Sequence, residues 1–118
     1  MSRGGPRMRR VNGLLREVVA DEVARLKDPG LGLVTITGVD TAPDLRAARV
    51  YYSVWGESEQ RESTEAALER ARSRVRAAVG GQVRLKYLPD FHFEFDPTVD
   101  GSQRINEILR SIGEGQAS

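Results

Sequence analysis

The segment that most constrains the fold of this 118-residue chain is rich in alanine and arginine and runs from Glu62 to two glycines. Gly80 and Gly81 end it, because glycine readily takes the left-handed conformation that follows a helix. At about 100° per residue, six of its apolar residues gather on one side of a helix. They are Ala67, Leu68, Ala71, Val75, Ala78 and Val79. The spacing predicts an amphipathic helix that packs on a flat surface.

The segment after the two glycines predicts that surface. Residues 83–88 alternate between apolar and polar, Pro89 interrupts the pattern, and residues 91–96 resume it. Alternation of this kind is typical of a half-buried β-strand. The resumed part carries a phenylalanine at every second position, at Phe91, Phe93 and Phe95, which places the three rings on one face. We therefore predict that the long helix packs on this strand and that their contact forms the core.

The N-terminal half predicts one more helix and a hairpin. Apolar residues recur with helical spacing between Met8 and Leu26, whereas residues 1–7 show no periodicity and are expected to form a flexible basic arm. Two β-rich runs, residues 33–39 and 45–55, are separated by a short polar loop, which predicts an antiparallel hairpin. One face of the second run is apolar and consists of Ala48, Val50, Tyr52 and Val54.

The C-terminal part predicts a last helix in residues 102–112 and a frayed tail in residues 113–118. The apolar positions of this helix are Ile105, Ile108, Leu109 and Ile112. The order helix, strand, strand, long helix, strand, helix indicates an α+β fold with a three-stranded sheet covered by helices on one face. A chain of this length forms one domain, which we place at residues 8–112.

Composition limits the functional classes. The chain has no cysteine, which excludes disulfides and thiolate metal sites and suits a reducing cytosol. No apolar run has the length of a membrane span, and the first residues lack the apolar core of a signal peptide. We therefore expect a cytoplasmic protein that has no membrane partner.

Basic residues are concentrated in parts of the chain although the net charge is only +1. Five arginines fall in the first sixteen residues, and residues 70–86 hold six basic residues and no acid. The candidate RNA-binding residues are the helix pairs Arg70/Arg74 and Arg72/Arg76, the strand pair Arg84/Lys86, and a stripe on the first helix made of Arg9, Arg16 and Lys27. Alternatively, these side chains only cover the core edge with their aliphatic parts while their charges reach water. If the arginines contact phosphates, exchanging Arg72 and Arg76 together for glutamine should weaken binding without melting the fold, since surface changes usually cost little stability.

The acidic residues give weaker evidence for a metal or catalytic site than the basic residues give for RNA binding. The last strand presents Asp90, His92, Glu94 and Asp96 on one face, and such residues could bind a metal or form a carboxylate pair. The chain offers no second histidine, no cysteine and no glycine-flanked nucleophile, so we favour a solvated strand face and expect no metal, no cofactor and no enzymatic activity. Glu22 lies among the valines of the first helix, and because uncompensated burial is costly, we expect that helix to rotate until the carboxylate reaches water.

Four motifs follow one another along the chain. They are Asp28-Pro29-x-Leu31-Gly32, then Pro43-Asp44-Leu45-Arg46-x-Ala48-x-Val50-Tyr51, then Leu85-x-x-Leu88-Pro89-x-Phe91-x-Phe93, and Asp96. In this order and spacing they resemble the bacterial ribosome-binding factor A family, from Arg7 to Ile112. The resemblance implies a type II KH-like fold of the order α-β-β-α(kinked)-β-α. It also implies a kink at Ala71 and Ser73, where the family has Ala-x-Gly.

The resemblance implies a non-enzymatic factor that binds the free small (30S) ribosomal subunit. Such a factor assists late maturation and 5′-end processing of 16S rRNA and is important for growth at low temperature. We expect a monomer off the ribosome that contacts RNA phosphates through the basic residues named above. Tyr51 and Trp55 are candidates for base stacking, unless Trp55 only covers the sheet edge. The alternative is a protein-binding module that docks a ribosomal protein through the hairpin edge or the stripe on the first helix.

Overall fold

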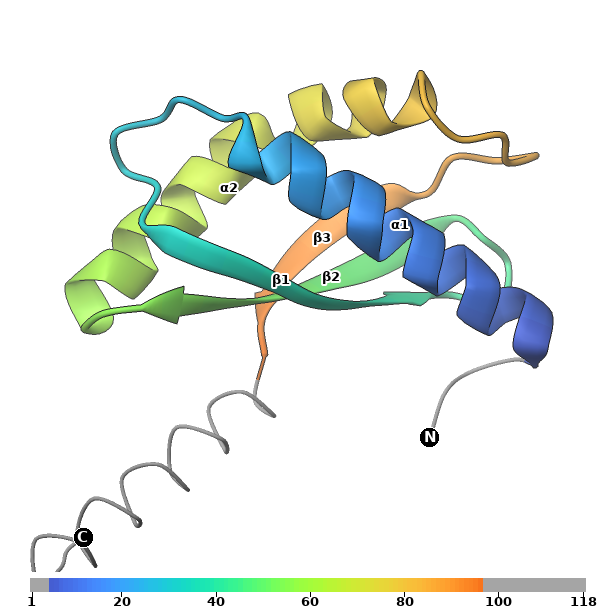
Figure 1. Cartoon of the computed structure of the whole chain (residues 1–118), viewed down its shortest axis with the longest axis horizontal. Coiled ribbons are helices and arrows are strands. Elements are labelled where there is room, and N and C mark those ends of the chain that lie inside the picture. Colours follow the sequence, from blue (N-terminus) through green and yellow to red (C-terminus); the bar gives the residue numbers. More distant parts are fainter. Residues whose placement is uncertain (1–4, 97–118) are drawn as a thin grey trace, which may run out of the picture.

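The computed structural model describes residues 5–96, which form a sheet with two helices packed against it (Figure 1). In chain order the elements are α1 (Pro6–Ala24), β1 (Leu33–Thr41), β2 (Ala47–Trp55), α2 (Ser58–Gly80) and β3 (Asp90–Phe95). The predicted α+β class is confirmed. The helix predicted in residues 102–112 and the tail predicted in residues 113–118 lie outside the described residues, as do the first four residues of the predicted arm.

β2 is the central strand of the sheet, between β1 and β3. It pairs antiparallel with β1, and Leu33 lies opposite Trp55 at one end of that pairing. It pairs in parallel with β3, beginning with Ala47 opposite Asp90. Parallel neighbours need a crossover connection, and α2 provides it.

Both helices cover the same face of the sheet, α1 over β1 and α2 over β2 and β3 (Figure 1). The predicted inner face of β2 is confirmed, since Ala48, Val50, Tyr52 and Val54 are at most 3% exposed. Opposite it, α2 buries Ala67, Leu68, Ala71, Val75 and Val79, and α1 buries Leu15, Val19 and Val23. The residues that alternate along the strands and those that recur every 3.6 positions along the helices therefore form one hydrophobic core.

The strand predicted in residues 83–88 is wrong, because β3 begins only at Asp90. The chain first continues to turn after α2, and the N–H groups of Gln82 and Val83 both donate to the carbonyl of Val79. β2 begins at Ala47, which lies opposite Asp90, so residues 83–88 have no part of β2 beside which to extend. Their apolar residues Val83, Leu85 and Leu88 instead pack against the hydrophobic core, with Leu88 beside Gly80 at the end of α2.

Two details of α1 differ from the sequence prediction. The helix begins at Pro6, so residues 6 and 7 are helical and do not belong to an arm; proline suits the first turn because its missing N–H is not needed there. The Glu22 side chain is only 13% exposed and does not escape to water. It accepts hydrogen bonds from Arg25 and Gln82, which compensate the burial and tie α1 to the segment after α2.

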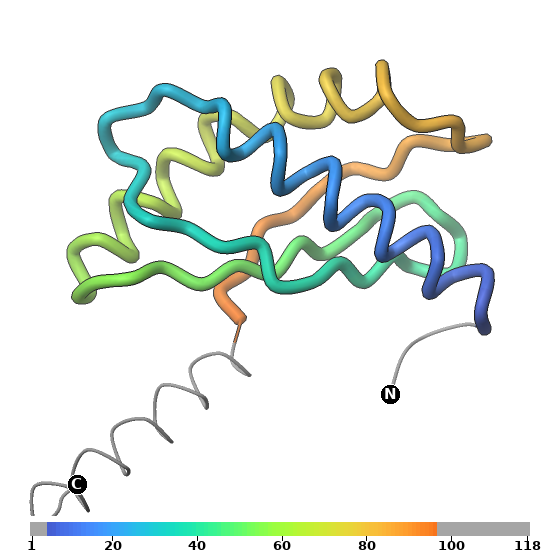
Figure 2. The backbone as a smooth tube through the Cα atoms, viewed as in Figure 1, coloured from blue at the N-terminus to red at the C-terminus, as the bar shows by residue number. Residues whose placement is uncertain are grey.

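α2 is helical without interruption from Ser58 to Gly80. Figure 2 shows that the axis of α2 changes direction along its length. Its first part rises obliquely over the sheet, and its last part runs roughly horizontally across the top of the view. The resemblance led us to expect a bent helix, and its placement at Ala71 and Ser73 stays a prediction. Ala71 is buried and Ser73 is exposed.

Candidate nucleic-acid interface

A hollow of about 460 Å³ lies where the segment after α1 meets the middle of α2. Three of its lining residues are basic, namely Lys27, Arg70 and Arg74. The others are Leu26, Asp28, Pro29 and Ala71. Lys27 was predicted to share a stripe with Arg9 and Arg16, but α1 ends at Ala24, and Lys27 joins the arginines of α2. The fold thus brings together basic residues that are more than forty positions apart in the chain.

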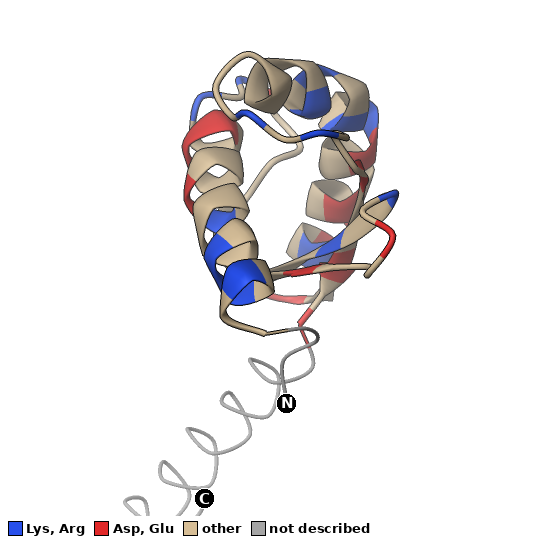
Figure 3. Cartoon of the chain, turned by 90° about the vertical axis from the view of Figure 1, so that its right-hand side faces the viewer, with Lys and Arg blue, Asp and Glu red and all other residues tan. Residues whose placement is uncertain are grey.

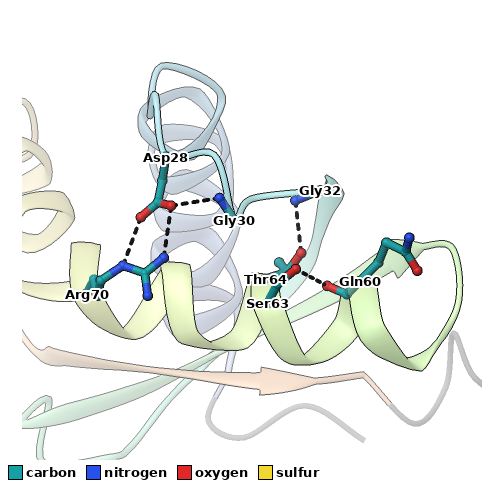
Figure 4. A network of polar contacts seen from close by, with 7 residues as sticks. All are labelled: Asp28, Gly30, Gly32, Gln60, Ser63, Thr64 and Arg70. Atoms are coloured by element: carbon teal, nitrogen blue, oxygen red, sulfur yellow. Dashed lines mark hydrogen bonds and ion pairs between the residues drawn. The ribbon is translucent and has the colours of Figure 1, made fainter.

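Asp28 fixes one of these cations. Its carboxylate accepts hydrogen bonds from Nε and Nη2 of Arg70, at 3.0 and 2.9 Å, and from the backbone N–H of Gly30 at 2.9 Å (Figure 4). The hydrogen bonds from Arg70, followed by that from Gly30, hold the pKa of Asp28 below its usual value. The same contact raises the pKa of Arg70. The Arg70 side chain is nevertheless 57% exposed, so it is oriented by Asp28 and still accessible to a ligand.

The turn that carries Asp28 is tied to α2 at two points. Gly30 lies so close to α2 that an added Cβ would meet Arg70 Nη2 at 3.1 Å and the carbonyl of Ser63 at 3.3 Å, which explains a glycine there. The N–H of Gly32 donates to Oγ1 of Thr64 at 2.9 Å (Figure 4). The motif Asp28-Pro29-x-Leu31-Gly32 therefore shapes one wall of the hollow.

Arg72 and Arg76 lie on the other flank of α2, and their guanidinium groups make hydrogen bonds and ion pairs within the domain. Arg76 donates from Nε to the carbonyl of Pro89 at 3.1 Å and from Nη2 to that of Leu88 at 2.7 Å, and it pairs with Asp90 at 3.1 Å. Arg72 pairs with Glu69 at 3.1 Å and reaches the carbonyl of Phe91 at 3.5 Å. The geometry gives these two residues a role in holding the entry to β3.

The remaining predicted residues lie on separate parts of the surface. Arg84 and Lys86 are exposed in the segment between α2 and β3, with Lys86 Nζ 5.6 Å from the centre of the Tyr87 ring. Arg9 and Arg16 are exposed on α1. Figure 3 shows Lys and Arg gathered toward the upper, C-terminal part of α2 and on the lower, N-terminal half of α1, with Asp and Glu lower on α2 and on the upper half of α1. The predicted basic residues thus lie in four places. Of these, the hollow is the place where basic residues from two distant segments of the chain come together.

The open sheet face carries the acids considered for a metal site. Asp90, His92 and Glu94 are exposed on β3, as the alternation predicts. Glu94 pairs with Arg49 at 3.4 Å, and Asp90 pairs with Arg76. Residues 5–96 contain no group of three histidine or acidic side chains placed to share a metal ion. Within the same range, no helix is long and apolar enough to cross a membrane.

Sequence reasoning missed the function of Asp28. Asp28-Pro29-Gly30 is recognisable as a turn, but its pairing with Arg70 crosses 42 positions. Helical spacing did separate Arg70 and Arg74 from Arg72 and Arg76, and this separation is observed. The signal available in the sequence was an acid at a tight turn together with an arginine-rich helix, and it does not say which arginine is bound.

Comparisons with known proteins point to one family. The family model described as ribosome-binding factor A matches residues 7–109. The ribosome-binding factor A of Rubrobacter xylanophilus is 47% identical over 107 residues, which are 90% of this chain and 87% of that protein. That of Halothermothrix orenii is 35% identical over 113 residues, 95% of this chain and 93% of that protein.

Solved structures of the same description share the fold. The crystal structure of ribosome-binding factor A from Thermus thermophilus superposes with a TM-score of 0.68 at 31% identity, over 75% of this chain and 93% of that one. The solution structure of a putative ribosome-binding factor A from Thermotoga maritima gives 0.70 at 28% identity, over 78% and 89%. A Thermus thermophilus homology model that was fitted into a cryo-EM map of a complex of 30S with ribosome-binding factor A gives 0.60 at 33% identity, over 70% and 87%.

Proposed function

The chain belongs to the ribosome-binding factor A family, as its four motifs indicated, and from this premise we propose that it binds the free small ribosomal subunit by contacting ribosomal RNA. The structure of a relative fitted into a map of a 30S complex supports this partner. The observation within this chain that supports it best is the hollow in which Lys27, Arg70 and Arg74 converge.

The hollow suits phosphate better than the flank of Arg72 and Arg76 does, where both side chains are held by backbone carbonyls and acids of the protein. Lys27 and Arg74 make no hydrogen bond or ion pair within residues 5–96, so their charges are available to a ligand. Asp28 holds Arg70 in one orientation. The Arg70 side chain therefore loses less conformational entropy when a phosphate binds. Cations in such a place release counterions when they neutralise RNA phosphates, and a folded RNA surface is then recognised by its shape.

We further propose that binding assists late maturation and 5′-end processing of 16S rRNA without catalysis by this chain. A factor that binds one RNA conformation more tightly than another shifts the equilibrium toward it by the difference in affinity. The need is greatest in the cold, where misfolded RNA escapes slowly. In this proposal the protein acts in the cytoplasm as a monomer off the ribosome, with no cofactor.

Salt dependence of binding tests the proposed RNA contact. The double variant Lys27→Gln/Arg74→Gln should bind purified small subunits and protein-free 16S rRNA more weakly, and its slope of log affinity against log salt should fall by about two units. The matched control is Arg9→Gln/Arg16→Gln, which removes the same charge from α1. An effect confined to the control would move the RNA face to α1. An unchanged slope in both variants would show that these cations do not contact RNA.

Growth in the cold tests the proposed cellular role. Cells that lack the gene should grow slowly and accumulate immature small subunits, more so at low temperature, and the wild-type chain should restore both. The Lys27→Gln/Arg74→Gln variant should restore less than Arg9→Gln/Arg16→Gln at equal protein levels. Purified protein that hydrolyses a nucleotide or carries stoichiometric metal would contradict the non-catalytic mechanism.

A further inference from the structure

Two large apolar side chains are exposed together at one end of the sheet. Leu33 is 74% exposed and Trp55 is 73% exposed. The two residues lie directly opposite each other on β1 and β2, which places their side chains on the same face about 5 Å apart at Cβ. The adjacent Val54 is buried under the helices, so alternation puts Leu33 and Trp55 on the face that the helices leave open. We call these two residues the Leu33–Trp55 patch.

Acidic residues follow this patch in the chain. Gly56 has a φ of 129°, a conformation that favours glycine, and turns the chain from β2 into α2 within two residues. The N-terminus of α2 therefore lies beside the Leu33–Trp55 patch, at the left end of the molecule in Figure 1. The exposed acids here are Glu57 at the N-cap of α2 and Glu59, Glu62 and Glu65 in its first turns; Glu69 follows them but is paired with Arg72. The one arginine among them, Arg61, stands over the Phe95 ring at 3.8 Å, where its charge is held at β3.

We propose that the Leu33–Trp55 patch is a docking site for a basic protein segment that inserts an apolar side chain between the two residues. Tryptophan is among the side chains that are enriched at the energetic centre of protein interfaces, and Leu33 adds apolar contact area beside it. The glutamates are complementary to lysines and arginines that flank such an anchor. Base stacking on Trp55 is disfavoured, because an RNA backbone needs a positively charged path and here would run beside the acids.

This inference rests on the proposed function, since a small subunit offers such a segment. Proteins that bind RNA carry basic stretches, and the protein component of an RNA particle is therefore a natural source of one. The two surfaces are on different sides of the domain: Arg74 and Lys27 line the helical side, and the patch lies on the open sheet face. One domain can then contact RNA and protein at the same time.

Trp55 reports its own occupancy because it is the only tryptophan of the chain. The emission of the free full-length protein should be that of a solvent-exposed indole and should be quenched by iodide. Individually purified, RNA-free proteins of the small subunit serve as probes. At least one should shift the emission to the blue, reduce iodide quenching and saturate, whereas protein-free 16S rRNA should leave the emission unchanged. A blue-shifted free protein, a response to rRNA alone, or no response to any ribosomal protein would each overturn the proposal.

Two variants that keep Trp55 complete the test. Leu33→Ser and Glu59→Lys should each weaken binding of the responding protein about tenfold, and binding to protein-free rRNA should stay unchanged or become tighter for Glu59→Lys. Leu14→Ser is the matched control, since Leu14 is 45% exposed on α1. Equal effects of Leu14→Ser and Leu33→Ser would overturn the docking site. Normal subunit binding by all three variants would remove this inference alone, whereas a wild-type chain that binds no subunit would remove the proposed function.

Discussion

Replacing Arg76 by glutamine is expected to destabilise the protein although Arg76 reads as a surface cation in the sequence. Its guanidinium joins α2 to the two residues that precede β3, through hydrogen bonds to the carbonyls of Leu88 and Pro89. Pro89 is buried, and β3 begins at the next residue. Glutamine is shorter and uncharged, so both carbonyls lose a charged donor.

The magnitude follows from these contacts. Hydrogen bonds from a charged donor contribute about 1.5–3 kcal/mol each when well buried. The Arg76 side chain is 41% exposed, which places both at or below the lower end of that range. The ion pair with Asp90, whose side chain is 65% exposed, adds at most about 0.5 kcal/mol. We therefore expect a loss of about 2 kcal/mol in the free energy of unfolding. For a domain of this size that corresponds to a fall of about 8–16 °C in Tm.

Urea unfolding followed by circular dichroism measures this loss. Arg74→Gln is the matched control on the same helix and should change the free energy of unfolding by less than about 0.5 kcal/mol. Arg76→Lys should be intermediate, because it keeps the charge and loses the fork of donors. Equal stabilities for Arg76→Gln and Arg74→Gln would refute the reasoning. A confirmed loss would mean that weaker RNA binding by an Arg76 variant must be corrected for unfolded protein.

Three further changes test other contacts. Asp28→Asn removes the ion pair to Arg70. Folding lowers the pKa of Asp28 below its ordinary value of 3.8, so the pair stabilises the folded protein fully above that value. This stabilisation is lost as the pH falls through the lower pKa of the folded state. The difference in urea midpoint from the wild type should therefore be steady near neutral pH and shrink below about pH 4, and a gap that widens in acid would contradict it. Thr41→Val should stabilise by about 1 kcal/mol in urea, because Oγ1 of Thr41 is buried and lacks a hydrogen-bond partner within residues 5–96; a clear loss would reveal a partner. Gly30→Ala should cost about 1–3 kcal/mol by crowding Arg70, whereas Gly13→Ala, which meets nothing within 4 Å, should not destabilise the helix, and thermal melts of both distinguish crowding from a general effect of alanine.

The faces of the elements could be predicted from the sequence because they follow from periodicity. Spacing alone placed alternate apolar residues of β2 on one face and gathered the apolar arc of α2; the β2 residues are buried, and so is the arc except for the half-buried Ala78. Residues 83–88 show the limit of the method. Their alternation is genuine, but a strand also needs a partner, and the start of β2 at Ala47 is set by the turn before it. That turn includes Leu45 at a φ of 62°, which no periodicity indicates.

The candidate site was predictable in its residue types and less so in their partners. Arg70 and Arg76 have similar neighbours in sequence and opposite flanks on α2, and spacing predicted that much. Which flank meets Asp28 and which meets the carbonyls before β3 depends on how far the two connecting segments extend. These are contacts between distant parts of the chain, and they follow only from the assembled fold.

The parallel pairing of β3 with β2 has a consequence for how the domain forms on the ribosome that makes it. The hairpin of β1 and β2 joins neighbouring segments and closes early, whereas β3 can pair only after the whole segment from Gly56 to Pro89 has crossed the sheet. During synthesis one edge of β2 therefore stays open until residues 90–95 leave the exit tunnel. An exposed strand edge beside apolar side chains invites aggregation, so the nascent chain carries this risk until β3 has paired with β2.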